Sequence, residues 1–278
     1  MKYFSKDRFC NFNLHYDSFY SLRYFFECMK KLDVKHCELI AGHQSLYMDH
    51  KEICDLSEVK QLSRDNGVKI DVITAQNCRF PYQYGAKEPE LREMTYEFFA
   101  NGIRMAAELG AHIVQCNTGW GYLNEPLEDC RKRCADLIRR LCEFADGYDV
   151  SLACESLRPQ ESLFGCRLDQ IKELSDMVDH PRFGILIDTT AMGVAGETIQ
   201  QWFDVFGKKI IHMHFIDANP YFHYLWGEGK RNLGEDLKVL YDNGYEGLIS
   251  QELTLGAYYQ HPYETDLKNL AAFSEYLY

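Results

Sequence analysis

The sequence has no hydrophobic run long enough to cross a membrane, and its opening stretch, MKYFSKDRFCNF, lacks the apolar core and cleavage site of a signal peptide. Basic charge is also scarce, because 30 Lys and Arg residues face 42 Asp and Glu residues, for a net charge of −12. Proteins that bind nucleic acid rely on a basic face for the phosphate backbone. We therefore expect a cytoplasmic protein that acts on small molecules, not on a membrane or a nucleic acid.

Two sequence signatures are missing as well. None of the eleven cysteines forms a Cys-x-x-Cys pair, and many lie in apolar segments such as VQCN and LACE, where cysteine usually acts as a small core residue. This pattern favours neither a disulfide framework nor a structural zinc site. No Gly-x-Gly-x-x-Gly follows the first predicted strand, so a dinucleotide-binding sheet has no support.

What the sequence does have is a regular alternation of short apolar runs and longer amphipathic segments. The apolar runs predict strands over 8–15, 36–41, 69–75, 112–117, 150–155, 184–188, 210–215 and 247–253. Apolar residues with helical spacing predict helices over 18–32, 52–65, 89–109, 125–146, 167–178, 196–206, 233–243 and 263–276. Such alternation indicates parallel βαβ units, and eight of them close into an α/β fold, the (β/α)8 TIM barrel, as one domain over residues 1–278. An open doubly wound sheet is the alternative.

The fifth to eighth predicted strands each end in a side chain that binds metal ions in proteins. These side chains are Glu155, Asp188, His214 and Glu252. Because active sites of such barrels lie at the C-terminal ends of the strands, we expect the four to meet at one height. Three carboxylates at close range repel one another unless a cation lies between them. The oxygen-rich set favours one Mn²⁺ ion, or else Co²⁺ or Mg²⁺, over a structural zinc. His212 shares the side of His214 and is interpreted as packed, or as a neighbour of the ligands.

The chain resembles the sugar isomerase/epimerase superfamily, which is built on the xylose-isomerase-like barrel. The resemblance runs from about residue 8 to the C-terminus and is carried by ACESLRPQES, LIDTTAM, HMHFID, WGEG and GYEGLISQEL. Within the superfamily the chain is most similar to the fructoselysine 3-epimerases and more distantly to the D-tagatose/D-psicose 3-epimerases. The resemblance implies that the same four side chains bind one divalent metal ion.

The resemblance also implies a reaction, namely epimerisation at C3 of a ketose or ketosamine. The adjacent carbonyl acidifies the C3 proton, and the metal ion stabilises the enediolate. Glu155 and Glu252 would be the catalytic pair, one removing the proton and the other returning it on the opposite face.

Further residues are candidates for contact with the sugar. The resemblance implies this role for Glu161, for Glu38 and for His223, which lies just before the glycine loop WGEG. Trp120, which follows the fourth predicted strand, is a candidate aromatic wall over one face of the sugar.

The chain departs from the tagatose/psicose-type pattern at two positions. Those enzymes carry a histidine where this chain has Ala191 and an arginine where it has Pro220. Both family residues contact sugar oxygens, so their absence argues against a free ketohexose as substrate. GEGKR, with Lys230 and Arg231, offers a phosphate site after the seventh strand, but Glu228 would face the phosphate unfavourably. We therefore expect a substrate without phosphate.

Two other activities that occur on the same fold remain alternatives for this chain. One is the catalytic subunit of a C-glycoside deglycosidase that acts on 3-oxo-sugars, which would need a partner chain in a hetero-oligomer. The other is an aldose–ketose isomerase. An abasic-site endonuclease would need extra histidines and a basic face, which the net charge of −12 opposes. The aromatic stretch YFHYLW makes a homodimer or homotetramer the expected assembly.

Overall fold

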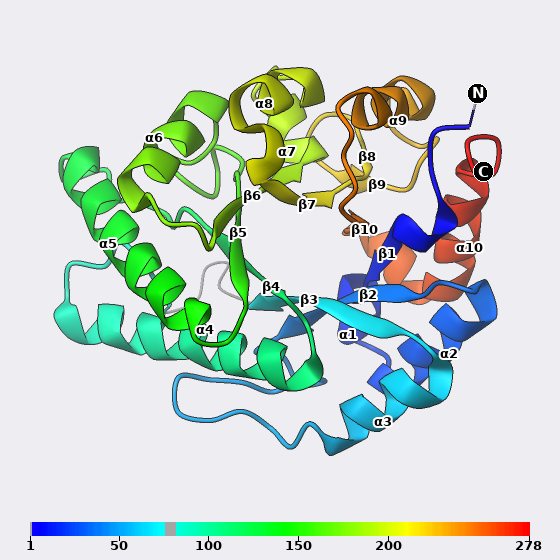
Figure 1. Ribbon diagram of the computed structural model, residues 1–278, viewed down its shortest axis with the longest axis horizontal. Coiled ribbons are helices and arrows are strands. Elements are labelled where there is room, and N and C mark those ends of the chain that lie inside the picture. Colours follow the sequence, from blue (N-terminus) through cyan, green and yellow to red (C-terminus); the bar gives the residue numbers. More distant parts are fainter. Residues whose placement is uncertain (1, 76–81) are drawn as a thin grey trace.

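Eight parallel strands close into a barrel in the computed structural model, which describes residues 2–75 and 82–278 (Figure 1). Neighbouring strands follow chain order, and the last barrel strand pairs with the first, with Phe9 opposite Ile249. The prediction of a (β/α)8 barrel is thus confirmed. The barrel strands are β1 (Phe9–Phe12), β2 (His36–Ala41), β3 (Lys69–Ala75), β4 (Ile113–Asn117), β5 (Ser151–Glu155), β6 (Phe183–Asp188), β7 (Ile210–His214) and β10 (Ile249–Gln251).

Helices surround the strands, as Figure 1 shows. All eight predicted helices are present, with small shifts at their ends. They are α2 (Leu22–Leu32), α3 (Ser57–Asn66), α4 (Pro89–Leu109), α5 (Leu127–Asp146), α6 (Leu168–Val178), α8 (Ile199–Phe206), α9 (Leu233–Asp242) and α10 (Pro262–Ala272). Shorter elements lie between them: α1 (Leu14–Asp17), α7 (Thr189–Val194), the hairpin strands β8 (Asp217–Ala218) and β9 (His223–Tyr224), and 3-10 helices over Lys6–Arg8, Gly207–Lys209 and Gly256–Gln260.

The helices bury one face against the barrel, as their sequence period requires. In α2, for example, Phe25, Met29 and Leu32 are buried, whereas Lys30 on the other side is exposed. The strands have helices outside and side chains inside the barrel, which explains their nearly continuous apolar runs. The ten cysteines among the described residues are free thiols, and nine of them are buried.

The end of the first strand differs from the prediction. The strand predicted over 8–15 ends at Phe12, because the chain turns into α1 after Asn13, whose carbonyl accepts hydrogen bonds from later backbone N–H groups. Buried contacts with α10 favour this turn, since His15 Nε2 lies 2.9 Å from one oxygen of Asp266 and the Tyr16 hydroxyl donates to the other at 2.6 Å. Tertiary contacts have therefore outweighed the local strand pattern.

The sixth strand is followed directly by α7, which the sequence did not predict. Asp188, the last residue of β6, is the N-cap of this helix, and its Oδ1 accepts a hydrogen bond from the backbone N–H of Ala191 at 2.9 Å. Such a cap satisfies backbone donors that a helix start leaves without intrahelical partners. The cap also fixes the Asp188 carboxylate at the mouth of the barrel.

Strand register brings the polar strand ends together. Asp188 of β6 pairs with His214 of β7, and His214 pairs in turn with Ser250 of β10. Glu155 ends β5, the strand next to β6, and Glu252 follows β10 directly. All four metal-competent residues therefore lie at the C-terminal end of the barrel.

The two ends of the chain lie side by side (Figure 1). Phe4 forms a bridge with Leu277, and the backbone N–H of Tyr3 donates to the carbonyl of Tyr276 at 2.9 Å. Phe273 packs on the rings of Phe4 and Phe9, the first residue of β1, so this contact lies where the strands begin. Within residues 2–75 and 82–278, no helix combines the length and the apolar character needed to cross a membrane.

Candidate metal centre and sugar cavity

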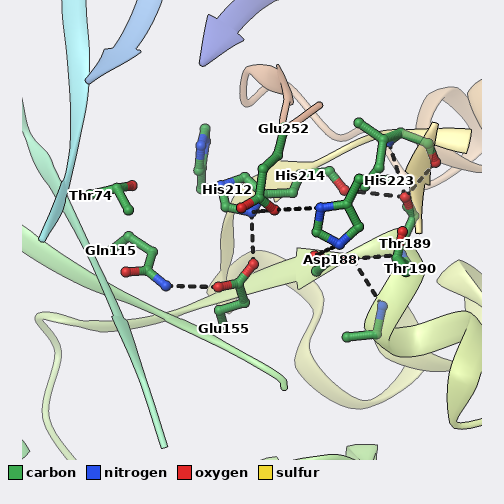
Figure 2. A network of polar contacts seen from close by, with 12 residues as sticks. Thr74, Gln115, Glu155, Asp188, Thr189, Thr190, His212, His214, His223 and Glu252 are labelled. Carbon is green, nitrogen blue, oxygen red and sulfur yellow. Dashed lines mark hydrogen bonds and ion pairs between the residues drawn. The ribbon is translucent and has the colours of Figure 1, made fainter. Parts of the chain in front are cut away.

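The structure brings together the four side chains predicted to bind a metal ion. Glu155, Asp188, His214 and Glu252 each offer one ligand atom, and these atoms all lie within 4.8 Å of one another. Figure 2 shows the carboxylates of Glu155 and Glu252 converging on the His214 ring. His214 Nδ1 lies 2.7 Å from Glu155 Oε1 and 3.0 Å from Glu252 Oε2.

Negative charge dominates this cluster. Burial alone would lower the pKa of His214, but the carboxylates of Glu38, Glu252 and Glu155 outweigh it and raise that pKa well above its ordinary value. Of these, the carboxylates of Glu155 and Glu252 belong to the cluster, where the charge that attracts a proton to His214 would also attract a divalent cation.

The two glutamates have different surroundings. Burial raises the pKa of Glu155 to about 7, with the charges of Glu252 and Asp188 adding to the rise and His214 opposing it. Burial also acts on Glu252, but His214 and His223 overcome it and lower the pKa of that carboxyl. Neighbouring carboxyls whose pKa values are pushed apart are typical of acid–base sites.

One oxygen of the cluster lacks a hydrogen bond, which provides a test of whether a metal ion fits. Glu252 Oε2 is buried and lies 3.0 Å from His214 Nδ1 and 3.2 Å from His223 Nδ1, yet neither nitrogen is aligned to donate to it. A buried carboxylate oxygen without a donor is costly. A divalent cation would satisfy it, and the donor set of three carboxylates and one imidazole suits Mn²⁺, Co²⁺ or Mg²⁺.

A cavity of about 230 Å³ opens beside this cluster. All four cluster residues line it, as do two of the predicted sugar-contact residues, Glu161 and His223. The remaining wall is mixed, with Phe12, Leu14, Ile40, Thr74, Ala75, Gln115, Ser156, Leu157, Arg158, Ala191 and Thr254. Polar and charged side chains predominate in the cavity lining as a whole, which suits a small polar ligand whose orientation they would fix.

Two predicted sugar-contact residues do not line this cavity. Glu38 is fully buried on the other side of His214, within hydrogen-bonding distance of its Nε2 atom. Trp120 lies half-buried in the loop after β4, and its carbonyl accepts a hydrogen bond from Leu163 at 2.9 Å.

Arg158 lines the cavity, although the sequence did not single it out. Its Nε and backbone N–H both donate to Glu161 Oε2 at 2.9 Å, its Nη2 donates to Glu161 Oε1, and its Nη1 donates to the carbonyl of Tyr221 at 2.7 Å. A guanidinium has five N–H donors. Within the described part of the chain, two of them remain available for a ligand. The signal in the sequence was a cation placed between two glutamates directly after a strand end.

Gln115 and His223 hold the carboxylates of the cluster in place. Gln115 Nε2 donates to Glu155 Oε2 at 2.7 Å, and His223 Nε2 lies 3.2 Å from Asp188 Oδ2 (Figure 2). Burial alone would lower the pKa of His223, but Asp188 and Glu252 raise it to about 10. The two carboxylates that His223 faces therefore favour its protonated form.

The backbone N–H groups of the glycine loop after β7 bind the carboxylate of Asp217. The buried carboxylate of Asp217 accepts hydrogen bonds from the backbone N–H groups of Gly227 at 3.0 Å, Gly229 at 2.8 Å and Arg231 at 2.9 Å. A Cβ atom at Gly229 would lie 2.2 Å from Asp217 Oδ1, so only glycine allows this approach. The N–H groups that a phosphate would need are therefore occupied.

Asp217→Asn is expected to lower the free energy of unfolding by about 2–3 kcal/mol, because an amide nitrogen would face backbone donors that now bind a carboxylate. The measurement is urea-induced unfolding followed by circular dichroism. Asp136→Asn is the matched control, since Asp136 is exposed on α5 and its loss should change stability by less than about 0.5 kcal/mol. Equal stability of the two variants would contradict this role of Asp217.

The chain is similar to known proteins over most of its length. A family model described as xylose isomerase-like TIM barrel matches residues 26–273. Fructoselysine 3-epimerase of Shigella flexneri is 27% identical over 219 residues, which are 78% of this chain and 79% of the relative.

Solved structures share the fold at lower sequence identity. D-Psicose 3-epimerase from Clostridium cellulolyticum H10, solved with D-tagatose, superposes with a TM-score of 0.79 at 16% identity and covers 97% of this chain and 99% of its own. A 3-keto-D-glucoside 4-epimerase from E. coli superposes with a TM-score of 0.76 at 17% identity and covers 96% of this chain and 99% of its own.

Proposed function

Because the chain belongs to the xylose isomerase-like TIM barrel family, we propose that it is a divalent-metal-dependent epimerase acting at C3 of a ketose or ketosamine. The chain is an enzyme of the isomerase class, as its relatives are sugar epimerases and isomerases. The proposal of epimerisation at C3 rests on one observation. The carboxylates of Glu155 and Glu252 both lie against His214, beside a cavity. Two carboxylates so placed can act as base and acid on one carbon.

Different side chains would bind the metal ion, transfer the proton and orient the catalytic carboxylate. Glu155, Asp188, His214 and Glu252 would hold the ion, which when bound supplies the positive charge that acidifies a proton next to a carbonyl. One glutamate takes the C3 proton, and the other returns a proton from the opposite side, in either direction of the reversible reaction. Gln115 keeps Glu155 oriented through its 2.7 Å hydrogen bond to Oε2.

The proposed substrate is a ketosamine of the fructoselysine or psicoselysine kind, without phosphate. Similarity to a fructoselysine 3-epimerase supports this choice. Ala191 offers the cavity only a methyl group, and Pro220 is exposed near the tip of the β8–β9 hairpin, so neither replaces the family's sugar-binding histidine and arginine. Arg158 and Glu161 provide charged groups at the cavity instead. The occupied N–H groups around Asp217 argue against a phosphorylated sugar.

The proposed cofactor is one Mn²⁺ ion, with Co²⁺ or Mg²⁺ as substitutes, because the donor set is rich in oxygen. The proposed assembly is a homodimer or homotetramer. Tyr221 and Phe222, which lie in the aromatic stretch YFHYLW, expose about half of their surface, as apolar groups at an interface between copies would.

The test of the proposal is proton exchange in deuterated water. We expect the Mn²⁺-loaded protein to incorporate deuterium at C3 of fructoselysine and to produce the C3 epimer, as followed by NMR. Deuterium at C1 or C2 would identify an aldose–ketose isomerase instead, and release of an aglycone from a 3-oxo-glycoside would identify a deglycosidase. No exchange at C3 of fructoselysine or of any free ketose would refute the proposed reaction.

A further inference from the structure

A buried carboxylate lies behind the metal centre, on strand β2. Glu38 is fully buried, and its Oε1 lies 3.1 Å from His214 Nε2 while its Oε2 lies 2.9 Å from His212 Nε2. The hydroxyl of Thr74 also donates to Oε1, so the Glu38 carboxylate has three hydrogen-bond partners in all. Glu38 does not line the cavity, so the catalytic proposal leaves it without a role.

The contacts of His214 differ at its two ring nitrogens. Nε2 faces Glu38, whereas Nδ1 faces Glu155 and Glu252. An ionised carboxylate only accepts hydrogen bonds, so Nε2 must carry a proton that it donates to Glu38. Nδ1 faces carboxylates as well, and a bound metal ion would take the place of a proton there. The imidazole would then be neutral, with its proton on Nε2 and its Nδ1 lone pair directed toward the metal centre.

His212 follows the same rule. Its Nδ1 is buried without a hydrogen-bond partner in the described part of the chain, so its Nε2 is the atom that donates, to Glu38. Glu38 thus accepts hydrogen bonds from two imidazoles and one hydroxyl. A glutamine in its place would offer one oxygen and two N–H donors, and one imidazole would then face a donor.

We propose that Glu38 is a positioning residue that holds His214 in the tautomer and orientation that present Nδ1 to the metal ion. The inference rests on the proposed function only in taking His214 as a ligand. A carboxylate that accepts the second N–H of a ligating histidine fixes its ring, and loss of such a partner typically weakens metal binding by about 10–100-fold.

A second metal ion is the competing explanation, since Glu38, His212 and His214 also offer atoms within 4.8 Å of one another. The separations of 2.9 and 3.1 Å between nitrogen and oxygen are those of N–H···O hydrogen bonds. The Thr74 hydroxyl already donates to the same carboxylate. The geometry therefore favours two N–H···O hydrogen bonds from His212 and His214 to Glu38, and not a second metal ion between them.

The first experiment measures metal binding without substrate. Metal-free wild type and Glu38→Gln are titrated with Mn²⁺ by calorimetry. We expect one ion per chain in both and a dissociation constant about 10–100-fold higher in the variant. Glu38→Asp, which keeps the charge, should recover part of the loss. The matched control is Glu143→Gln, since Glu143 is exposed on α5. Binding by Glu38→Gln within threefold of wild type, or two ions per chain in wild type, would overturn the proposal.

The second experiment uses wild-type protein, so its result does not depend on whether the Glu38 variants fold. Wild type labelled with ¹⁵N-histidine and loaded with Mg²⁺ is studied by long-range ¹H–¹⁵N NMR, and His214→Gln assigns the His214 signal by its absence. We expect a proton on Nε2 and none on Nδ1, whereas the reverse tautomer would overturn the proposal. Neither readout involves turnover, so an absence of C3 epimerisation would refute the proposed function and leave this inference standing.

Discussion

Glu155→Gln is expected to slow C3 epimerisation by about 10²–10⁴-fold, the range that a positioned general acid or base contributes. Glu252→Gln should cause a loss of similar size. Because each glutamate serves one face of the substrate in the proposed mechanism, each variant should still exchange the C3 proton of one epimer with deuterated water. The two variants should differ in which epimer exchanges.

The measurement combines initial rates from both epimers, deuterium uptake by NMR and metal content by elemental analysis, all at saturating Mn²⁺. Metal content matters because both glutamates also belong to the ligand cluster. Glu143→Gln on the exposed face of α5 serves as the control and should keep the wild-type rate. Turnover of either active-site variant within tenfold of wild type would remove that glutamate from the mechanism.

Removal of the divalent ion is expected to lower turnover by about 10³-fold or more, since a Lewis acid contributes several kcal/mol and each 1.4 kcal/mol is about tenfold in rate. Stability should fall as well. Glu155, Asp188 and Glu252 lie within 4.8 Å of one another, so without a cation their charges repel. At a free ion concentration of about 1,000 times the dissociation constant, binding adds about 4 kcal/mol.

The experiment compares chelator-treated protein before and after addition of Mn²⁺, Co²⁺ or Mg²⁺, with rate and unfolding temperature recorded together. Mn²⁺ should restore the highest rate. Asp188→Asn is the informative variant, because it keeps the shape of the side chain and removes one of the three charges, so its unfolding temperature should respond much less to the ion. Full activity in protein shown by elemental analysis to be free of metal would exclude the proposed chemistry.

The metal cluster could be predicted because it depends on little more than the order of the strands. Glu155, Asp188 and His214 are each the last residue of an apolar run, and Glu252 directly follows one. A closed parallel barrel brings such positions together whatever the loops do. The prediction therefore needed only the strand pattern, which parallel strands display strongly.

Glu38 was predicted to contact the sugar and Arg158 was not singled out, because their positions depend on contacts between distant parts of the chain. Glu38 interrupts the apolar run HCELIA, which signals a buried charge, but its partner His212 lies 174 positions further along the sequence. Arg158 owes its place to a loop that bends back to Glu161 and to the carbonyl of Tyr221. Neither strand nor helix periodicity carries information about such contacts.

The bridge between Phe4 and Leu277 has a practical consequence. The chain ends meet where the barrel strands begin, and the cavity opens where they finish. An affinity tag, a surface attachment or a fused domain at either end would therefore project from the opposite pole of the molecule. The catalyst can be anchored on a solid support by its termini while the entrance for sugar stays open to solution.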